Sequence, residues 1–444
     1  MLQEKTLNEA LSTVSLRSID GRETYPAGQV RYLSDSGSLL DVWHDFDALR
    51  AQINRALFDQ RVRSAPGPRV EPVTDSGVWR YRELILPAPV NTIISRPEGN
   101  TPLYEHPCMS EWIGVDEFYL KHEGENPTGS FKDRGMTVGV TQAMLIGAQA
   151  VACASTGNTS ASLAAYAARA GLPAFIFIPA GKIAAGKLAQ ALAYGANTLQ
   201  INGDFDDAMR LVQQVCNEMG IYLLNSLNPF RLEGQKSIVF EILQGFNWQP
   251  PDWIVLPGGN LGNTAAFGKA LYEARELGLI DSMPRLATIQ AEGASPFYQS
   301  YLTGFSERKS VKANTIATAI SIGNPVSYER AIRALNWTNG VSISVTDEEI
   351  MNAKALIDST GIGCEPASAA SVAGARKLVD NGVIASDETV VGILTGNLLK
   401  DPTATVDYHT GNWPNAKLAN RPIVLEPTLS AVQKEIEKRL ARAH

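Results

Sequence analysis

The sequence predicts an α/β protein with two domains, each built on a parallel sheet, and a site in the crevice between them. From about residue 117 onward, short β-branched or aromatic runs alternate with alanine-rich segments of helical spacing. This alternation is interrupted after residue 224 and resumes at residue 252. It is typical of parallel sheets covered on both faces, which bind ligands beside the carboxyl ends of their strands. The 444 residues, 44% of them hydrophobic, suffice for two or three domains of ~150 residues.

The first series of elements covers residues 149–224. Its clearest strand is Pro173–Pro179, whose sequence PAFIFIP is the continuous apolar run of a strand buried on both faces. The alanine-rich segments between such runs have the length of helices. We expect strands at 149–154, 173–179, 197–201 and 221–224, and helices at 158–170, 184–194 and 205–219.

The second series begins at residue 252. A strand at Asp252–Leu256 leads through the glycine-rich segment 258–263 into a helix, which is the order expected of a βα unit. We expect further strands at 286–290 and 389–394, and helices at 264–277, 327–335, 346–359 and 366–379.

The two ends of the chain differ from this pattern. Residues 1–90 contain few long apolar segments, and we expect an N-terminal extension of short strands with one helix near 45–54. Residues 406–444 form a C-terminal segment that ends in an amphipathic helix. We expect this helix to pack against the body through the apolar face formed by Leu429, Val432, Ile436 and Leu440.

Composition and charge exclude several classes of protein. The formal net charge of −7 and the absence of a basic tract argue against binding to nucleic acid or to an anionic membrane. The apolar run 174–180 is far shorter than the ~20 residues of a membrane span, and no signal peptide is visible. The 4 cysteines are widely separated, which favours reduced thiols and a cytoplasmic protein.

A first chemical segment is ENPTGSFKDRG, residues 125–135. A Pro-Thr-Gly turn leads into a helix, for which we expect Ser130 as the N-cap and Lys132 in the first turn. The helix dipole there disfavours a cation and lowers the pKa of Lys132, which favours a free amine able to form a Schiff base. Taken alone, the segment fits a solvated surface lysine equally well.

Three further segments place small polar residues where a strand ends. ASTGNTSAS (154–162) and PGGNLGN (257–263) each join a strand to a helix, and such helix N-termini bind anions. A plain capped helix or tight turn would not need so many polar and glycine residues. LTGN (394–397) also follows a strand, but by itself it fits an ordinary turn.

Taken together, these segments resemble the threonine synthases among the fold-type II pyridoxal-phosphate enzymes. The resemblance covers about residues 90–405 and includes AGKIAAGKLAQALAYGA (180–196), NPFRLEGQKS (228–237), ATAISIGNP (317–325), EPASAAS (365–371) and LTGNLLKDP (394–402). It implies two α/β domains with the cofactor, pyridoxal 5'-phosphate, in the cleft between them. We expect the large domain at 91–130 and 225–405, and the small domain at 131–224.

The same resemblance implies roles for individual residues. Lys132 is similar to the lysine that binds the cofactor covalently, Asn158 to the asparagine at the ring hydroxyl, and Thr395 to the hydroxyl residue at the pyridine nitrogen. The cofactor phosphate loop is Gly259, Asn260, Leu261, Gly262 and Asn263. The substrate phosphate is assigned to Thr159, Ser226 and Arg231, with Lys182 as a weaker candidate.

The implied reaction converts O-phospho-L-homoserine and water to L-threonine and phosphate. A family of this kind is usually homodimeric. Cysteate synthase, which uses O-phosphoserine and sulfite, would keep the same cofactor residues and stays open. A threonine dehydratase would leave Arg231 without a phosphate partner, and a non-catalytic amino-acid sensor would not need all of the cofactor residues.

The sequence departs from its relatives at two places. Many relatives have paired cysteines before a GGLLDV-like phrase, whereas Leu33, Ser36, Ser18 and Gly21 stand at those places here, so we expect no metal. Relatives often read TGHGLKDP where this chain reads TGNLLKDP. We expect Asn397 and Leu398 to lie near the cofactor and to affect substrate preference.

Overall fold

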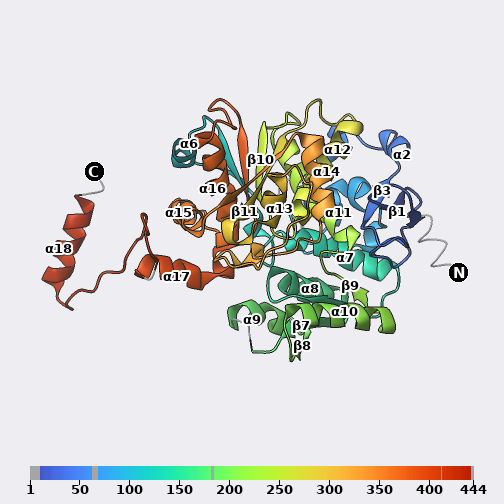
Figure 1. Cartoon of the computed structure of the whole chain (residues 1–444), viewed down its shortest axis with the longest axis horizontal. Coiled ribbons are helices and arrows are strands. Elements are labelled where there is room, and N and C mark those ends of the chain that lie inside the picture. Colours follow the sequence, from blue (N-terminus) through green and yellow to red (C-terminus); the bar gives the residue numbers. More distant parts are fainter. Residues whose placement is uncertain (1–10, 63–68, 182–184, 412, 442–444) are drawn as a thin grey trace.

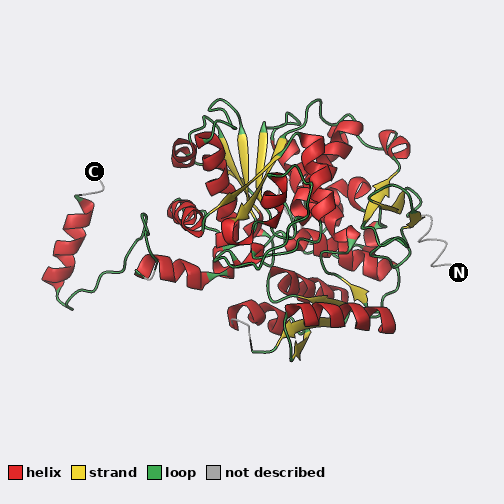
Figure 2. Cartoon of the chain, viewed as in Figure 1, coloured by secondary structure: helices red, strands yellow, loops and turns green. Residues whose placement is uncertain are grey.

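The computed structural model describes residues 11–62, 69–181, 185–411 and 413–441, with the side chains of 185–187 left out. Within these ranges, three sheets organise the chain (Figures 1 and 2). The four-stranded sheet lies below the six-stranded sheet in the view of Figure 1, and the three-stranded sheet lies at the N-terminal side of the body. The predicted α/β class with parallel sheets is confirmed.

The six-stranded sheet has the order β12-β11-β10-β13-β5-β4 and is parallel except for β4, which pairs antiparallel with β5. The sequence reading omitted β12, a short strand between two predicted helices. The strands are β4 Leu103–Glu105, β5 Phe118–His122, β10 Trp253–Pro257, β11 Arg285–Ala291, β12 Val341–Val345 and β13 Val390–Leu394. The helices of this part are α6 Pro107–Ile113, α12 Gly262–Glu276, α13 Pro296–Tyr301, α14 Tyr328–Thr338, α15 Asp347–Ser359 and α16 Pro366–Asp380, and the 3-10 turns are η3 Glu123–Glu125, η4 Glu292–Ala294, η5 Thr318–Ile320 and η6 Leu398–Lys400.

The four-stranded sheet is entirely parallel, with the order β8-β7-β6-β9. Successive residues of β6 and β7 contribute to two separate apolar clusters, one against α8 and one against α10, so both faces of the sheet are covered. Every element expected between 149 and 224 forms. The elements are β6 Val151–Ala154, α8 Asn158–Ala170, β7 Ala174–Pro179, α9 Ala185–Ala193, β8 Asn197–Ile201, α10 Phe205–Met219 and β9 Tyr222–Leu223.

Two buried helices, α7 (Lys132–Leu145) and α11 (Pro229–Gly245), pack directly against each other. A Cβ atom added to Gly234 would lie 1.8 Å from the backbone oxygen of Arg134, and one added to Gly135 would lie 2.8 Å from that of Arg231. Neither distance is possible for a real side chain. The two glycines therefore allow backbone contact between the helices, and this contact fixes Lys132 relative to Arg231.

An ion-pair network is buried beside this helix contact. The Arg134 guanidinium donates from Nε to Glu123 at 2.6 Å and from Nη2 to Glu241 at 2.7 Å. Lys121 donates to the same Glu241 carboxylate at 2.6 Å. Although burial opposes ionisation, Arg134 and Lys121 hold the pKa of Glu241 well below its usual range. The network joins α7, α11, β5 and η3.

The N-terminal extension packs onto α11 and α12 through an apolar cluster that includes Leu40, Val42 and Trp79. The helix expected near 45–54 forms as the shorter Phe46–Arg50, and a second short helix follows at Arg55–Gln60, where Asn54 is the N-cap and accepts from the Leu57 N–H at 2.8 Å. The extension consists of β1 Val14–Ser18, β2 Thr24–Pro26, β3 Leu40–His44, α2 Phe46–Arg50, α3 Arg55–Gln60, α4 Pro72–Asp75, η1 Trp79–Tyr81, α5 Arg82–Ile85 and η2 Val90–Thr92.

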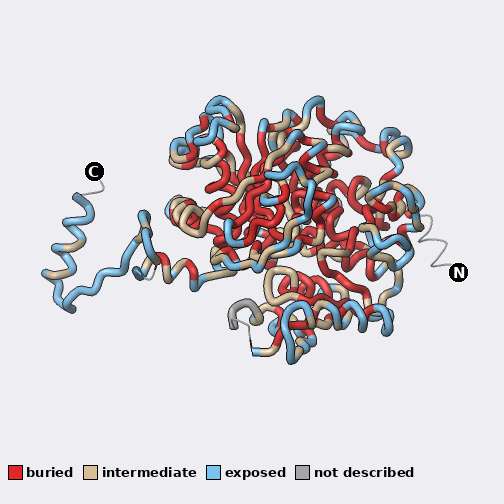
Figure 3. Tube along the Cα trace, viewed as in Figure 1, coloured by how far each residue is buried: buried red, intermediate tan, exposed pale blue. Residues whose placement is uncertain are grey.

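The C-terminal segment contains α17 (Pro402–Thr410) and α18 (Leu429–Leu440). The expectation that the last helix packs against the body is wrong. Helix α18 stands away from it on an extended connection, and its four apolar residues are all exposed to solvent (Figures 1 and 3). Among the helices of the described residues, none combines the length and the apolar character that crossing a lipid bilayer requires.

We predict that Arg134→Leu lowers the free energy of unfolding by about 3–5 kcal/mol, because it leaves two buried carboxylates with Lys121 as their cation. Urea unfolding followed by circular dichroism measures the change. The control is Arg210→Leu, which removes an exposed pair with Asp207 and should cost less than ~1 kcal/mol. Equal losses in the two variants would contradict this assignment.

Candidate active site

A cavity of about 930 Å³ lies where elements of the two larger sheets meet. It is lined by the start of α7, the turn between β6 and α8, the start of α11, the turn between β10 and α12, and the end of β13. The cavity brings together all but one of the predicted site residues. They are Lys132, Asn158, Thr159, Ser226, Arg231, Gly259, Asn260, Leu261, Gly262, Asn263 and Thr395. The remaining candidate, Lys182, lies outside the described residues.

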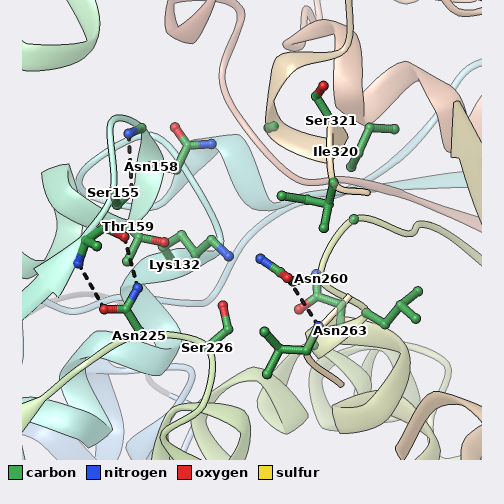
Figure 4. A pocket seen from close by; sticks show the side chains of 18 of the residues that line it. Lys132, Ser155, Asn158, Thr159, Asn225, Ser226, Asn260, Asn263, Ile320 and Ser321 are labelled. Atoms are coloured by element: carbon green, nitrogen blue, oxygen red, sulfur yellow. Dashed lines mark hydrogen bonds between the residues drawn. The ribbon is translucent and has the colours of Figure 1, made fainter. Parts of the chain in front are cut away.

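Lys132 is the first residue of α7, and its side chain points between Asn158 on one wall and Asn260 on the other (Figure 4). The expectation that Ser130 caps this helix is wrong, since Phe131 occupies the cap position. Ser130 instead forms an antiparallel bridge with Gly396, and the Phe131 N–H donates to the Thr395 carbonyl at 3.1 Å. This bridge ties Lys132 to the end of β13.

Burial and, to a smaller extent, the positive charge of Arg231 lower the pKa of Lys132 to about 7, with Glu365 opposing the shift. The sequence reading expected a lowered pKa but attributed it to the helix dipole. Desolvation in the cavity is the main cause. Near neutral pH, a large share of the Lys132 side chains therefore carries a free amine, the form that attacks a carbonyl group.

The loop before Lys132 is held by Asp133. Its carboxylate accepts from the Thr128 N–H at 2.7 Å, from the Thr128 hydroxyl at 2.6 Å and from the Ser162 hydroxyl at 2.6 Å. Burial nevertheless raises the pKa of Asp133 to about 6. These bonds fix the approach of the chain to Lys132 and connect it to α8.

Asn158 and Thr395 share a neighbour that the sequence reading left without a role. The Glu365 carboxylate accepts from Asn158 Nδ2, at 3.2 Å for each of its oxygens, and from the Thr395 hydroxyl at 3.5 Å. The Thr395 hydroxyl also lies 3.0 Å from the Ser368 hydroxyl. Glu365 therefore orients two side chains that enter the cavity from opposite sheets.

The segment 258–263 is a tight turn that exposes its backbone to the cavity. A Cβ on Gly258 would lie 2.5 Å from the Thr288 side chain, and one on Gly259 would lie 3.1 Å from Ile320 Cα, so both positions favour glycine. Leu261 has a φ of 63° and forms the N-cap of α12. This left-handed turn at a helix N-terminus suits a phosphate group.

Arg231 provides a second anion site in the same cavity. It is buried, and its Nη1 donates to the Leu224 carbonyl at 3.2 Å. Nε and Nη2 are buried but have no hydrogen-bond partner among the described residues. Desolvation lowers the pKa of Arg231 to about 10. A buried guanidinium with two unmet donors is suited to bind a phosphate or carboxylate.

Several residues that line the cavity were not assigned by the sequence reading. They include Gln235 of α11, Lys400, and parts of the segment 310–326, in which Ile320 and Ser321 lie across the cavity from Asn158 and near the turn 258–263 (Figure 4). Burial lowers the pKa of Lys400, whose ammonium contacts the Gln190 side-chain oxygen of α9. The motifs that carry the resemblance contain Gln235, Lys400 and part of this segment. A position within a motif, however, does not reveal which side chains face the cavity.

Asn397 and Leu398, which we expect near the cofactor, are not among the residues that line the cavity, although Thr395 and Lys400 on either side of them are. The Asn397 side chain accepts from the Leu399 N–H at 3.0 Å and so caps η6, and its own N–H donates to the Gly129 carbonyl at 2.9 Å. The substitution of a histidine-glycine pair by these residues therefore changes a turn outside the cavity wall.

One cluster with metal-ligating side chains occurs among the described residues, and it lies outside the cavity. His44, Glu233 and Glu273 converge at the contact between the extension and α11. Lys236 donates to Glu273 at 2.5 Å, and Lys269 pairs with Glu233. Because the ammonium groups supply the positive charge, this cluster is an ion-pair network that fastens the extension.

The cavity fits pyridoxal phosphate. It combines a free amine for the aldehyde, a backbone turn for the phosphate and a neutral hydroxyl at Thr395 for the pyridine nitrogen. The residues that would hold the cofactor thus lie together in the cavity. Gly258 and Gly259 have no side chain that could obstruct the turn beside them.

Comparison with known proteins agrees with this reading. Residues 94–396 match the family model described as "Pyridoxal-phosphate dependent enzyme". The threonine synthase of Methanosarcina acetivorans is 46% identical over 95% of this chain and 98% of its own. That of Methanocaldococcus jannaschii is 46% identical over 88% of this chain and 94% of its own. Threonine synthase 2 of Arabidopsis thaliana is 43% identical over 94% of this chain and 83% of its own.

Solved structures share the fold. Threonine synthase from Escherichia coli aligns with a TM-score of 0.65 at 17% identity, covering 96% of this chain and 100% of that one. Threonine deaminase isoform 2 from Solanum lycopersicum aligns with a TM-score of 0.60 at 21% identity, covering 78% and 98%. Together with the family match and the close relatives, this establishes that the chain belongs to the pyridoxal-phosphate-dependent enzymes and, within them, to the threonine synthases.

Proposed function

We propose that this chain converts O-phospho-L-homoserine and water to L-threonine and phosphate. The observation that carries the proposal is Arg231, whose two unmet donors are buried in the same cavity as the free amine of Lys132. A substrate with one amine and one phosphate satisfies both groups at once. The reaction breaks the C–O bond between the γ carbon and phosphate and forms a C–O bond from water to the β carbon.

Lys132 is the proposed catalytic residue. Bound pyridoxal phosphate supplies an electron sink that stabilises negative charge beside the carbon bearing the substrate amine. Lys132 Nζ holds the cofactor in the resting enzyme and, once displaced by the substrate amine, accepts the α proton and then a β proton. Its lowered pKa suits these transfers, because an amine that titrates near the working pH both accepts and returns protons.

Asn158 and Thr395 are proposed to orient the cofactor ring. Asn158 Nδ2 donates one amide hydrogen to the ring hydroxyl, and the Glu365 carboxylate accepts the other. Thr395 meets the pyridine nitrogen with a neutral hydroxyl, which leaves the ring a weaker electron sink than a carboxylate partner would. Residues 259–263 hold the cofactor phosphate at the start of α12.

Arg231 is proposed to bind the substrate phosphate, with Thr159 and Ser226 as neighbouring donors and Lys182 as a weaker candidate. The cavity walls around Arg231 include Leu227 and Leu232, so water is partly excluded and the charge-assisted bonds are strengthened. We further propose that the large domain comprises 91–130 and 225–405, the small domain 131–224, and that the enzyme acts as a cytoplasmic homodimer.

Incubation of the cofactor-loaded protein with O-phospho-L-homoserine should release threonine and phosphate in equal amounts. Lys132→Ala should abolish both products while the circular dichroism spectrum is retained, because the variant lacks the amine that holds the cofactor and transfers the protons. Lys377→Ala, which alters a partly exposed lysine outside the cavity, is the control and should keep full activity. Threonine formation by Lys132→Ala would refute the catalytic role. A loaded wild-type protein that makes no threonine would refute the substrate.

Arg231→Ala should raise the KM for O-phospho-L-homoserine by about 10-fold to 100-fold, the loss expected for hydrogen bonds to a charged group. Arg231→Lys should recover part of the loss, since it restores the charge but not the two-pronged geometry. Steady-state kinetics with saturating cofactor measures both. An unchanged KM in Arg231→Ala would move the phosphate site elsewhere.

The amine of Lys132 should titrate near pH 7 in protein without cofactor. It is protonated and unreactive below that pH and free above it. Acetylation of Lys132, followed by mass spectrometry of its peptide, should therefore accelerate between about pH 6 and about pH 8. In Arg231→Ala the midpoint should move upward, because a neighbouring positive charge has been removed. A midpoint close to that of an ordinary lysine would contradict the environment described.

A further inference from the structure

Gln235 occupies an unusual place in the cavity. It lies on α11, one turn after Arg231, and its side chain is buried between α7 and the phosphate turn. A Cβ on Gly135 would lie 3.3 Å from Gln235 Nε2, and one on Gly262 would lie 3.4 Å from Gln235 Oε1. The amide therefore spans the space between the helix that carries Lys132 and the first residue of α12.

The end of this amide beside Gly262 has no partner. Gln235 is 3% exposed, and its Oε1 is buried without a hydrogen-bond partner among the described residues. Buried amides normally satisfy both ends. Gln290, the other glutamine beside the turn, does so: its Nε2 donates to the Gly258 carbonyl at 3.0 Å and its Oε1 accepts from the Phe297 N–H at 2.9 Å.

The unmet end faces a site built for an anion. The start of α12 presents backbone N–H groups and the positive end of the helix dipole. An amide oxygen would repel an anion there, whereas an amide nitrogen would donate to it. Rotation of the amide by 180° exchanges the two atoms and changes no other heavy-atom position.

We propose that Gln235 is a side-chain ligand of the cofactor phosphate, with Nε2 turned toward Gly262. The proposal rests on the assignment of 259–263 to that phosphate. It adds a side-chain donor from α11 to a turn that otherwise offers its backbone and Asn260 and Asn263. The same helix then carries one ligand for each phosphate, Arg231 for the substrate and Gln235 for the cofactor.

The test compares pyridoxal phosphate with pyridoxal, which lacks the phosphate. Dissociation constants for both are measured on full-length protein without cofactor, by quenching of tryptophan fluorescence. The variants are Gln235→Leu, which removes the donor, and Gln235→Glu, which keeps the shape and adds a negative charge. Gln142→Leu is the matched control: Gln142 is also buried with an unpartnered Oε1, but it binds the Ala27 carbonyl and lies outside the cavity.

The preference for pyridoxal phosphate over pyridoxal should fall about 10-fold in Gln235→Leu and further in Gln235→Glu, while the affinity for pyridoxal stays unchanged. Gln142→Leu should keep the wild-type preference. Gln235→Asn, which shortens the side chain by one carbon, serves if the leucine variant does not fold, and should show the same loss.

Two results would overturn the proposal. An unchanged preference in both Gln235→Leu and Gln235→Glu would exclude a contact with the cofactor phosphate, and a raised KM for the phosphorylated substrate in that case would place the amide at the other phosphate. Equal weakening of both ligands would indicate that Gln235 supports the shape of the cavity only. A wild-type protein that binds both ligands equally would instead refute the phosphate turn itself.

Discussion

The site depends on the contact between α7 and α11. Gly135 and Gly234 let the two backbones touch, and a single methyl group at either position would force the helices apart. Lys132 lies at the start of one helix, and Arg231 and Gln235 lie on the other, so the contact sets the spacing between the amine and the two side chains proposed to bind phosphate. Arg134 then locks the pair through buried bonds to Glu123 and Glu241.

Electrostatic balance within the cavity follows from this spacing. Lys132 and Arg231 both lie in a desolvated space, and the positive charge of Arg231 disfavours that of Lys132. Glu365 offsets part of this repulsion while it orients Asn158 and Thr395. Because Arg231 is the stronger base, it keeps its proton, and the Lys132 amine is the group that loses its proton near neutral pH. The chemistry of the lysine is therefore set by side chains that come from other helices.

Much of the fold could be predicted from the sequence because its signals are local. The elements of 149–224 alternate in composition, and each has a clear breaker such as Gly171 or Gly220, which ends its helix in the left-handed conformation. The turns after β6, β10 and β13 could be placed at one site because strand ends converge in parallel sheets, whereas Arg231 and the roles of the individual residues came from the resemblance to the family. Ser130 was misread because its pairing with Gly396 is a long-range contact. Gln235 could not be assigned, since neighbouring residues on a buried helix give no sign of which one faces a cavity. Glu365, the N-cap of α16, could not be assigned because its contacts with Asn158 and Thr395 are long-range.

The exposed position of α18 shows the same limit, since an amphipathic pattern identifies an apolar face but not what covers it.

The proximity of Arg231 to Lys132 has a thermodynamic consequence. An anion that neutralises Arg231 removes the repulsion that suppresses the charge of Lys132, so bound phosphate and a bound proton favour each other by the same free energy. A substrate phosphate bound to Arg231, as proposed, therefore raises the pKa of the Lys132 amine. Departure of the phosphate then lowers this pKa, and the amine returns its proton more readily at the stage when the product forms.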